Sequence, residues 1–146
     1  MNSDFDAVGD FHEKFGLDNK THHQKMRPGL ISPAVQDFRL MFLYEELHEL
    51  EAGYADKDLA QIADALVDLV YVALGTAQMH GLPWKELFAE VQRANMQKER
   101  ASSASASKRG SEFDVIKPVD WQPPNINEVL VAHGWPGRPL PLESGS

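Results

Sequence analysis

The chain has 146 residues, of which 42% are hydrophobic and 25% charged, as is typical of a single soluble globular domain. Its formal net charge of −8 argues against a nucleic-acid-binding protein, because such a protein needs a basic face to hold phosphates. The absence of cysteine excludes disulfides and thiolate metal sites and favours a reducing cytoplasm. No apolar run approaches the roughly 18 residues of a membrane span, so no membrane partner is expected.

The first predicted element is a short helix over residues 4–15, with the apolar side chains of Phe5, Val8, Phe11 and Phe15 on one side. Residues 16–31 follow as a loop rich in glycine, proline and basic residues. This loop is either a solvated connection or a segment that helps to hold an anionic ligand.

A long helix is predicted next, from Ser32-Pro33 to about Tyr54, because a hydroxyl N-cap followed by proline is typical of a helix start. The apolar stripe of this helix begins at Val35 and continues at helical spacing. Halfway along, the stripe turns acidic, with carboxylates at Glu45, Glu46 and Glu49.

Two further long helices are predicted, over residues 58–80 and 83–100. Asp58 and the glutamine three residues later resemble a capping box, and Gly81 and Pro83 separate the two helices. The first of the two presents a wide apolar face: Leu59, Ile62, Leu66, Leu69, Val70, Ala73 and Ala77. A chain of 146 residues can hardly cover this face alone, so association of two protomers is expected to bury the remainder.

The C-terminal part is predicted to be irregular. Residues 101–111 have low complexity and are expected to be mobile, and the proline-rich tail contains one short helix, INEVLVAHG, begun by Asn125 or Asn127. No strand pairing is indicated. The sequence therefore predicts an all-α fold: a core of antiparallel helices over residues 1–100, completed by oligomerisation, and a flexible linker and tail over residues 101–146.

Two pairs of acids are expected to share one site. Glu46 and Glu49 lie three apart on one helix, and Asp64 and Asp68 lie four apart on the next, so each pair points to one side. If antiparallel packing brings these sides together, the carboxylates need countercharge, and Mg²⁺ prefers carboxylate oxygens. The alternative is a solvated acidic face.

A different metal site is also conceivable. Glu45-x-x-His48 has the spacing of a ligand pair in ferritin-like di-iron bundles. That architecture needs a second Glu-x-x-His on another helix, which the chain does not offer, so we interpret His48 as a residue outside the metal ligand set.

Several stretches in this order resemble a known superfamily: YEELHEL, DALVDLVYVALGTA, MHGLPW, FAEVQRANMQK and the ending KPVDWQPPNI. They look like the all-α nucleoside triphosphate pyrophosphohydrolases, which include MazG-like proteins, dimeric dUTPases and phosphoribosyl-ATP pyrophosphohydrolases. The chain is most similar to the MazG-like, phosphoribosyl-ATP pyrophosphohydrolase-like subgroup of bacteria and phages. The resemblance extends over residues 32–125.

The resemblance implies a Mg²⁺-dependent enzyme that cleaves a nucleoside triphosphate between its α- and β-phosphates, releasing a monophosphate and pyrophosphate. It implies two or more Mg²⁺ ions per site, or Mn²⁺. The metal ligands would be Glu46, Glu49 and Asp68, while Glu45 would orient or activate water together with Glu46. Asn95 and Lys98 match an Asn-x-x-Lys pattern that contacts metal or phosphate.

One position departs from the pattern. Ala65 stands where many members carry glutamate, so either Asp64 reaches the metal from one residue earlier or the site has one ligand fewer. Candidates to stack on or edge the base are Phe11, His12 and Phe15, with Trp84 or Trp121 as others; the alternative for each is packing in the core. Lys117 or Arg109 would fold over the phosphates.

The resemblance also implies a homodimer or homotetramer in the cytoplasm of a bacterium, or of the host if a phage encodes the chain. The expected substrate is a purine deoxynucleotide such as dGTP. The alternatives are hydrolysis of dUTP or dCTP, and a helical protein that binds nucleotides without cleaving them.

Overall fold

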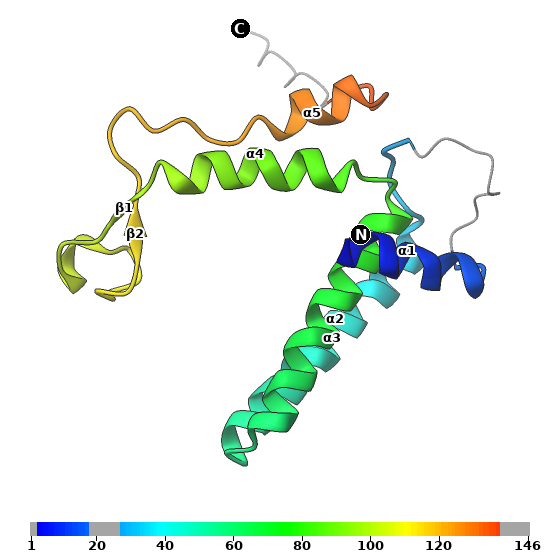
Figure 1. The fold of residues 1–146 in the computed structure, drawn as a ribbon, viewed down its shortest axis with the longest axis horizontal. Helices are drawn as coiled ribbons and strands as arrows, with labels where there is room; N and C mark the ends of the chain where they lie inside the picture. The colour runs from blue at the N-terminus through cyan, green and yellow to red at the C-terminus, as the bar shows by residue number, and fades with distance from the viewer. Residues whose placement is uncertain (1–2, 18–26, 138–146) are drawn as a thin grey trace, which may run out of the picture. The chain divides into compact units, whose positions relative to one another are not determined.

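A computed structural model describes residues 3–17 and 27–137 (Figure 1). These residues form five α-helices, one short 3-10 helix and a two-stranded sheet, so the all-α class is confirmed. Their internal contacts group the chain into two compact units, Met1–Leu82 and Pro83–Ser146. The division after residue 100 stays a prediction, and most of the basic loop predicted after residue 15 lies outside the described residues.

The first unit is built on two long antiparallel helices, α2 (Pro33–Ala55) and α3 (Leu59–Met79), which lie side by side (Figure 1). Their starts agree with the sequence. The Ser32 hydroxyl caps α2 by accepting a hydrogen bond from the backbone N–H of Val35, and the Asp58 carboxylate caps α3. α2 ends at Ala55 and the Asp58 cap begins α3 three residues later, so a short turn joins the two helices as a hairpin.

Two contacts fix how α2 lies on α3. Near the turn, Gly53 lets the backbones approach, since a β-carbon there would lie 3.0 Å from Cγ1 of Ile62. Farther along, the Arg39 guanidinium is only 8% exposed. It donates hydrogen bonds of 2.9 Å to the carbonyl oxygen of Val72 and 3.0 Å to the hydroxyl of Thr76. These contacts set the spacing of the two helices along their length.

Helix α1 (Asp4–Lys14) packs on the C-terminal half of α3. Its Val8 and His12 side chains are 2% exposed. The amide of Gln78 in α3 donates a 2.9 Å hydrogen bond to the backbone carbonyl of Phe5. Gly75 leaves the space that the His12 ring and the Arg39 guanidinium occupy. α1, α2 and α3 therefore meet at one polar, tightly packed point.

The second unit differs from the sequence-based expectation. Helix α4 (Trp84–Met96) ends before the predicted residue 100, because β1 (Glu99–Arg100) pairs antiparallel with β2 (Val115–Ile116). The expected absence of strand pairing was wrong. Residues 101–111, whose mobility stays a prediction, include the 3-10 helix η1 (Ala104–Ala106), and the buried Ser107 hydroxyl donates a 2.6 Å hydrogen bond to Asp114.

The short helix predicted in the tail is confirmed as α5 (Ile126–Ala132), which begins after Asn125. The backbone N–H of Asn125 donates a 2.9 Å hydrogen bond to the Glu90 carboxylate of α4. Arg93 forms an ion pair of 2.7 Å with the same carboxylate. Contacts between α4 and α5 therefore depend on polar groups as well as on apolar packing.

The apolar face of α3 is only partly covered. Leu59 is 78% exposed and Leu66 and Val70 are also exposed, whereas Ala65 is 2% exposed. These large side chains are therefore left uncovered by the rest of the chain. By length and composition alone α3 could cross a membrane, contrary to the expectation that no segment qualifies.

We expect Gly75→Ala to destabilise the fold. A β-carbon at this position would lie 2.6 Å from a terminal nitrogen of Arg39 and would also overlap the His12 ring. Alanine gains about 1 kcal/mol of helix propensity, but overpacking costs about 1–3 kcal/mol and displaces a hydrogen-bonded guanidinium. Urea unfolding should therefore show a lower free energy of unfolding. Gly29→Ala is the control, because nothing lies within 4 Å of that position. Equal effects of the two substitutions would contradict this account of the helix contact.

Candidate functional site

Glu46 is the carboxylate in α2 that the structure perturbs most clearly. Its side chain is half-buried. The pKa of Glu46 is raised above its ordinary value, first by burial. Neighbouring negative charges raise it further, and in decreasing order they belong to Asp68, Glu49, Asp64 and Glu45. Since Coulomb energy falls with distance, the five acids of the sequence prediction lie close enough to interact.

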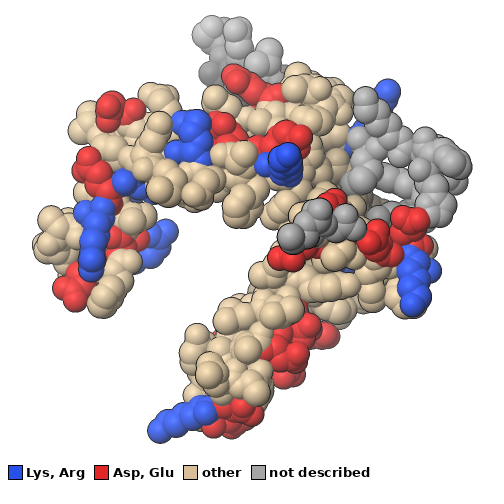
Figure 2. Space-filling view, in the orientation of Figure 1, with Lys and Arg blue, Asp and Glu red and all other residues tan. Residues whose placement is uncertain are grey.

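The five acids come from the facing stretches of α2 and α3. Figure 2 shows acidic side chains along this hairpin. Glu46 and Asp68 are half-buried, whereas Glu45, Glu49 and Asp64 are exposed. The order of the charges that act on Glu46 places Asp68, from the other helix, ahead of the two glutamates of α2 itself. Packing of α3 on α2 thus creates the strongest like-charge interaction at this carboxylate.

Whether these acids would bind a cation depends on donor chemistry and on arrangement. Carboxylate oxygens are the donors that Mg²⁺ and Mn²⁺ prefer, and a bound cation would relieve the repulsion at Glu46. In the arrangement described here, however, no group of three or more histidine, aspartate or glutamate side chains in residues 3–17 and 27–137 is poised to hold a metal. The donor set and its charge fit a divalent cation, and the side chains would have to turn inward to enclose one.

Ala65 and Gln61 define the side of α3 where the sequence departs from the superfamily pattern. Ala65 is buried, so the position expected to carry glutamate faces packed atoms. The Gln61 amide donates a 3.4 Å hydrogen bond to the backbone carbonyl of Glu49. Gln61 therefore links the two helices, and Asp64 is the remaining acid on this part of α3.

An aromatic cluster adjoins the acids. The Phe11 ring lies 4.8 Å from that of Phe15 and meets Tyr71 edge-on, with centroids 5.4 Å apart. Phe11 and Phe15 are both partly exposed, whereas His12 is buried and belongs to the packed core. Tyr71 lies three residues after Asp68 on α3, so the Tyr71 member of the cluster is one helical turn from that acid.

The remaining predicted residues belong to the second unit. Asn95 is exposed near the end of α4. The ammonium groups of Lys98 and Lys117 lie 5.4 Å and 4.7 Å from the centroid of the Trp121 ring. The structure thus brings Lys98 and Lys117 together on one aromatic ring.

Sequence reasoning missed Tyr71 and Arg39. Tyr71 had a usable signal, because residues three apart on a helix share a face and Asp68 was already a candidate. Arg39 had none, since its role comes from contacts with Val72 and Thr76 in another helix. His48, the residue of the di-iron alternative, is paired through Nδ1 with the carbonyl oxygen of Tyr44 at 2.8 Å.

We expect Glu46→Gln to stabilise the metal-free protein near neutral pH. A carboxyl group whose pKa is raised on folding lowers stability while it is ionised. As pH falls through the raised pKa the folded state takes up the proton first, so the advantage of glutamine should shrink toward the ordinary pKa of 4.5. Thermal unfolding in EDTA across this range measures the difference. Glu51→Gln, which removes an exposed charge from the same helix, is the control. A pH-independent difference would show that the charge of Glu46 is not responsible.

Comparison with protein families places these features in a known group. The family model for phosphoribosyl-ATP pyrophosphohydrolase matches residues 8–95. No curated protein matches the chain at a significant level. The matched range covers more than half of the chain and contains α2, α3 and all five acids. The chain therefore belongs to the phosphoribosyl-ATP pyrophosphohydrolase family, within the MazG-like all-α nucleoside triphosphate pyrophosphohydrolase superfamily.

Proposed function

We propose that this pyrophosphohydrolase cleaves a nucleoside triphosphate between the α- and β-phosphates, with Mg²⁺ as cofactor. Family membership supports a pyrophosphohydrolase that acts on nucleotides. The proposal of a metal-dependent cleavage is supported chiefly by Glu46, whose pKa is raised and which lies among four other carboxylates. Such a concentration of negative charge repels a triphosphate unless cations intervene, so a divalent cation belongs to the proposed active form.

The acids have distinct proposed roles. Glu46, Glu49 and Asp68 would hold the metal, with Asp64 in the place of the missing glutamate. Two or more Mg²⁺ ions, or Mn²⁺ ions, would neutralise the phosphates and make the α-phosphorus more electrophilic. Glu45 would orient or activate the attacking water, together with Glu46.

The base is proposed to bind at the aromatic cluster of Phe11, Phe15 and Tyr71. The rings of Phe11 and Phe15 are partly exposed, and Tyr71 lies one helical turn from Asp68. Stacking favours the larger purine rings, in agreement with the dGTP preference expected from the resemblance to phage enzymes. The name of the matching family also makes phosphoribosyl-ATP a substrate to test.

The active form is proposed to be a cytoplasmic homodimer or homotetramer. Large apolar side chains are exposed along α2 and α3, among them Phe38, Met41, Tyr44, Val67 and Val70. Exposed apolar area of this extent along two neighbouring helices is typical of an interface. A second copy of the chain offers a matching apolar surface. Packing against it would remove the exposed apolar side chains of α3 from water.

A protein that binds nucleotides without cleaving them is the second candidate. Two observations favour it. Ala65 is buried where many superfamily members carry glutamate. Among the residues that the structure describes, no three histidine, aspartate or glutamate side chains are arranged to hold a metal ion. Binding without turnover in both Mg²⁺ and Mn²⁺ would support this candidate against hydrolysis.

We expect the products of nucleoside triphosphate hydrolysis to be a monophosphate and pyrophosphate. In ¹⁸O-labelled water the label should enter the monophosphate, since the proposed attack is on the α-phosphorus. Glu49→Ala should lower turnover by at least about 100-fold, because a metal ligand is lost. Glu51→Ala, an exposed acid two residues along the same helix, is the matched control. Release of orthophosphate and a diphosphate would reject the reaction type.

We expect dGTP to give the highest kcat/KM in a panel of canonical nucleotides, deaminated nucleotides and phosphoribosyl-ATP. Loss of one stacking ring costs about 1–3 kcal/mol, so Phe11→Ala should raise KM for the best substrate about 5- to 150-fold with kcat nearly unchanged. Leu17→Ala removes an exposed apolar side chain just after α1 and should leave KM unaltered. An unchanged KM in Phe11→Ala would place the base elsewhere.

We expect light scattering to give at least twice the chain mass of 16.3 kDa. Phe38→Lys, at an exposed position of α2, should shift the particle toward the monomer because it places a charge on the apolar face. Lys85→Gln changes an exposed residue of α4 and is the control. A 16.3 kDa particle at every protein concentration would argue against self-association.

A further inference from the structure

The second unit contains a basic pocket that the family match does not cover. Its volume is about 610 Å³. The residues that line it follow the end of α4 and surround the β1–β2 hairpin; they are Lys98, Ala106, Lys108, Arg109, Asp114, Val115, Ile116 and Lys117. All of them lie beyond residue 95, where the match to the family ends. The pocket is therefore a feature of the C-terminal part of this chain.

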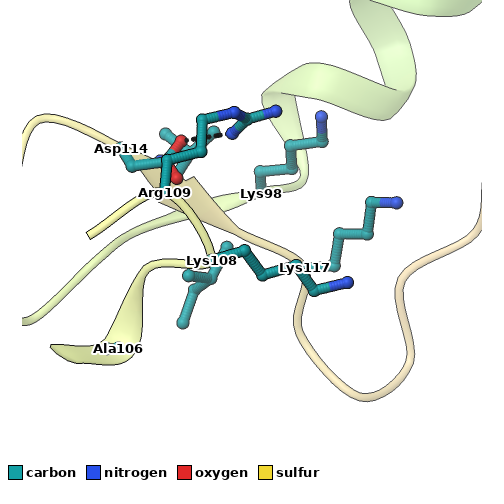
Figure 3. A pocket seen from close by; sticks show the side chains of 8 residues that line it. Lys98, Ala106, Lys108, Arg109, Asp114 and Lys117 are labelled. Atoms are coloured by element: carbon teal, nitrogen blue, oxygen red, sulfur yellow. Dashed lines mark hydrogen bonds and ion pairs between the residues drawn. The ribbon is translucent and has the colours of Figure 1, made fainter. Parts of the chain in front are cut away.

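Charge in the basic pocket is strongly one-sided. Four cationic side chains and a single carboxylate, Asp114, line it. Figure 3 shows the long side chains of Lys98, Lys108, Arg109 and Lys117 extending from the hairpin in roughly the same direction. The excess of positive charge is unusual in a chain with a net charge of −8.

The single carboxylate does not neutralise the lysines. Asp114 accepts hydrogen bonds of 2.6 Å from the Ser107 hydroxyl and 2.9 Å from the backbone N–H of Val115. It forms a 2.8 Å ion pair with Arg109. The Ser107 hydrogen bond is the largest cause of the lowered pKa of Asp114, so the carboxylate stays ionised and engaged. Among the described residues, no carboxylate forms an ion pair with a pocket lysine.

Two of the lysines are held in place by the fold. Glu99 pairs with Ile116 and Arg100 with Val115, so the antiparallel hairpin sets Lys98 and Lys117 opposite one another. Both ammonium groups lie over the Trp121 ring, which is itself anchored by a 2.6 Å hydrogen bond from its indole N–H to the carbonyl of Ala94. An anion entering the pocket would meet cations that are already assembled, which lowers the entropy lost on binding.

We propose that the basic pocket binds an oligophosphate, either pyrophosphate or the phosphate chain of a nucleotide. A pocket of this volume falls within the range of small-molecule sites, about 300–1,000 Å³. Several ammonium groups and a planar guanidinium match the closely spaced charges of linked phosphates better than a single monovalent anion. The nucleotide as a source rests on the proposed function, whereas the oligophosphate assignment rests on the pocket alone.

The test is calorimetric titration of the full-length protein with inorganic pyrophosphate in EDTA, where the acids of α2 and α3 carry no cation and repel the ligand. Lys108→Gln and Lys117→Gln should each weaken binding about fivefold to tenfold, because each removes one charge-assisted contact. Both side chains are exposed, so the fold should persist. Lys85→Gln, an exposed lysine outside the pocket, should bind like the wild type. Orthophosphate should bind at least about tenfold more weakly than pyrophosphate.

The outcomes separate this inference from the proposed function. Unchanged affinity in both pocket variants, or equal affinity for orthophosphate and pyrophosphate, would overturn the oligophosphate site even if hydrolysis is observed. Pyrophosphate binding that depends on Lys108 and Lys117 would support the site even if no hydrolysis occurs. Kinetics of the Lys108→Gln variant then show which molecule occupies the pocket. A higher KM with unchanged kcat indicates the phosphate chain of the substrate. Weaker inhibition by pyrophosphate with unchanged KM indicates the released product.

Discussion

Like charges held at close range by helix packing are the constraint on which the rest of this structure depends. Gly53 brings the backbones of α2 and α3 together, and the buried Arg39 fastens them farther along. The helices therefore cannot spread to relieve the repulsion between Glu46 and Asp68 without losing these contacts. A cation is the simplest relief, and a triphosphate carries cations with it.

The two units have opposite electrostatic character. The α2–α3 hairpin gathers carboxylates, which attract divalent cations, while the hairpin of the second unit gathers lysines around Trp121, which attract phosphates. A chain with a net charge of −8 can still present a positively charged pocket, because the local distribution of charge differs from the total.

Helix α3 shows that an apolar residue in the sequence need not be buried against the rest of its own chain. Its composition is apolar enough for a membrane span, yet Asp64 and Asp68 lie within it. Ala65 is packed against the chain's own atoms while Leu66 and Val70 are exposed. Small residues such as Gly75 are buried where helices approach closely, whereas part of the large apolar side chains remains on the surface.

The sequence by itself determined the all-α class, the starts of α2 and α3 at Ser32 and Asp58, and the set of interacting acids, because caps and helical spacing are local properties of the chain. Only the tertiary structure decided that Ala65 is buried, that Arg39 joins two helices, and that the Ser107 hydroxyl bonds to Asp114. These features depend on contacts between residues distant in the chain, or on a hydrogen bond that closes a loop, and no local pattern encodes such pairings.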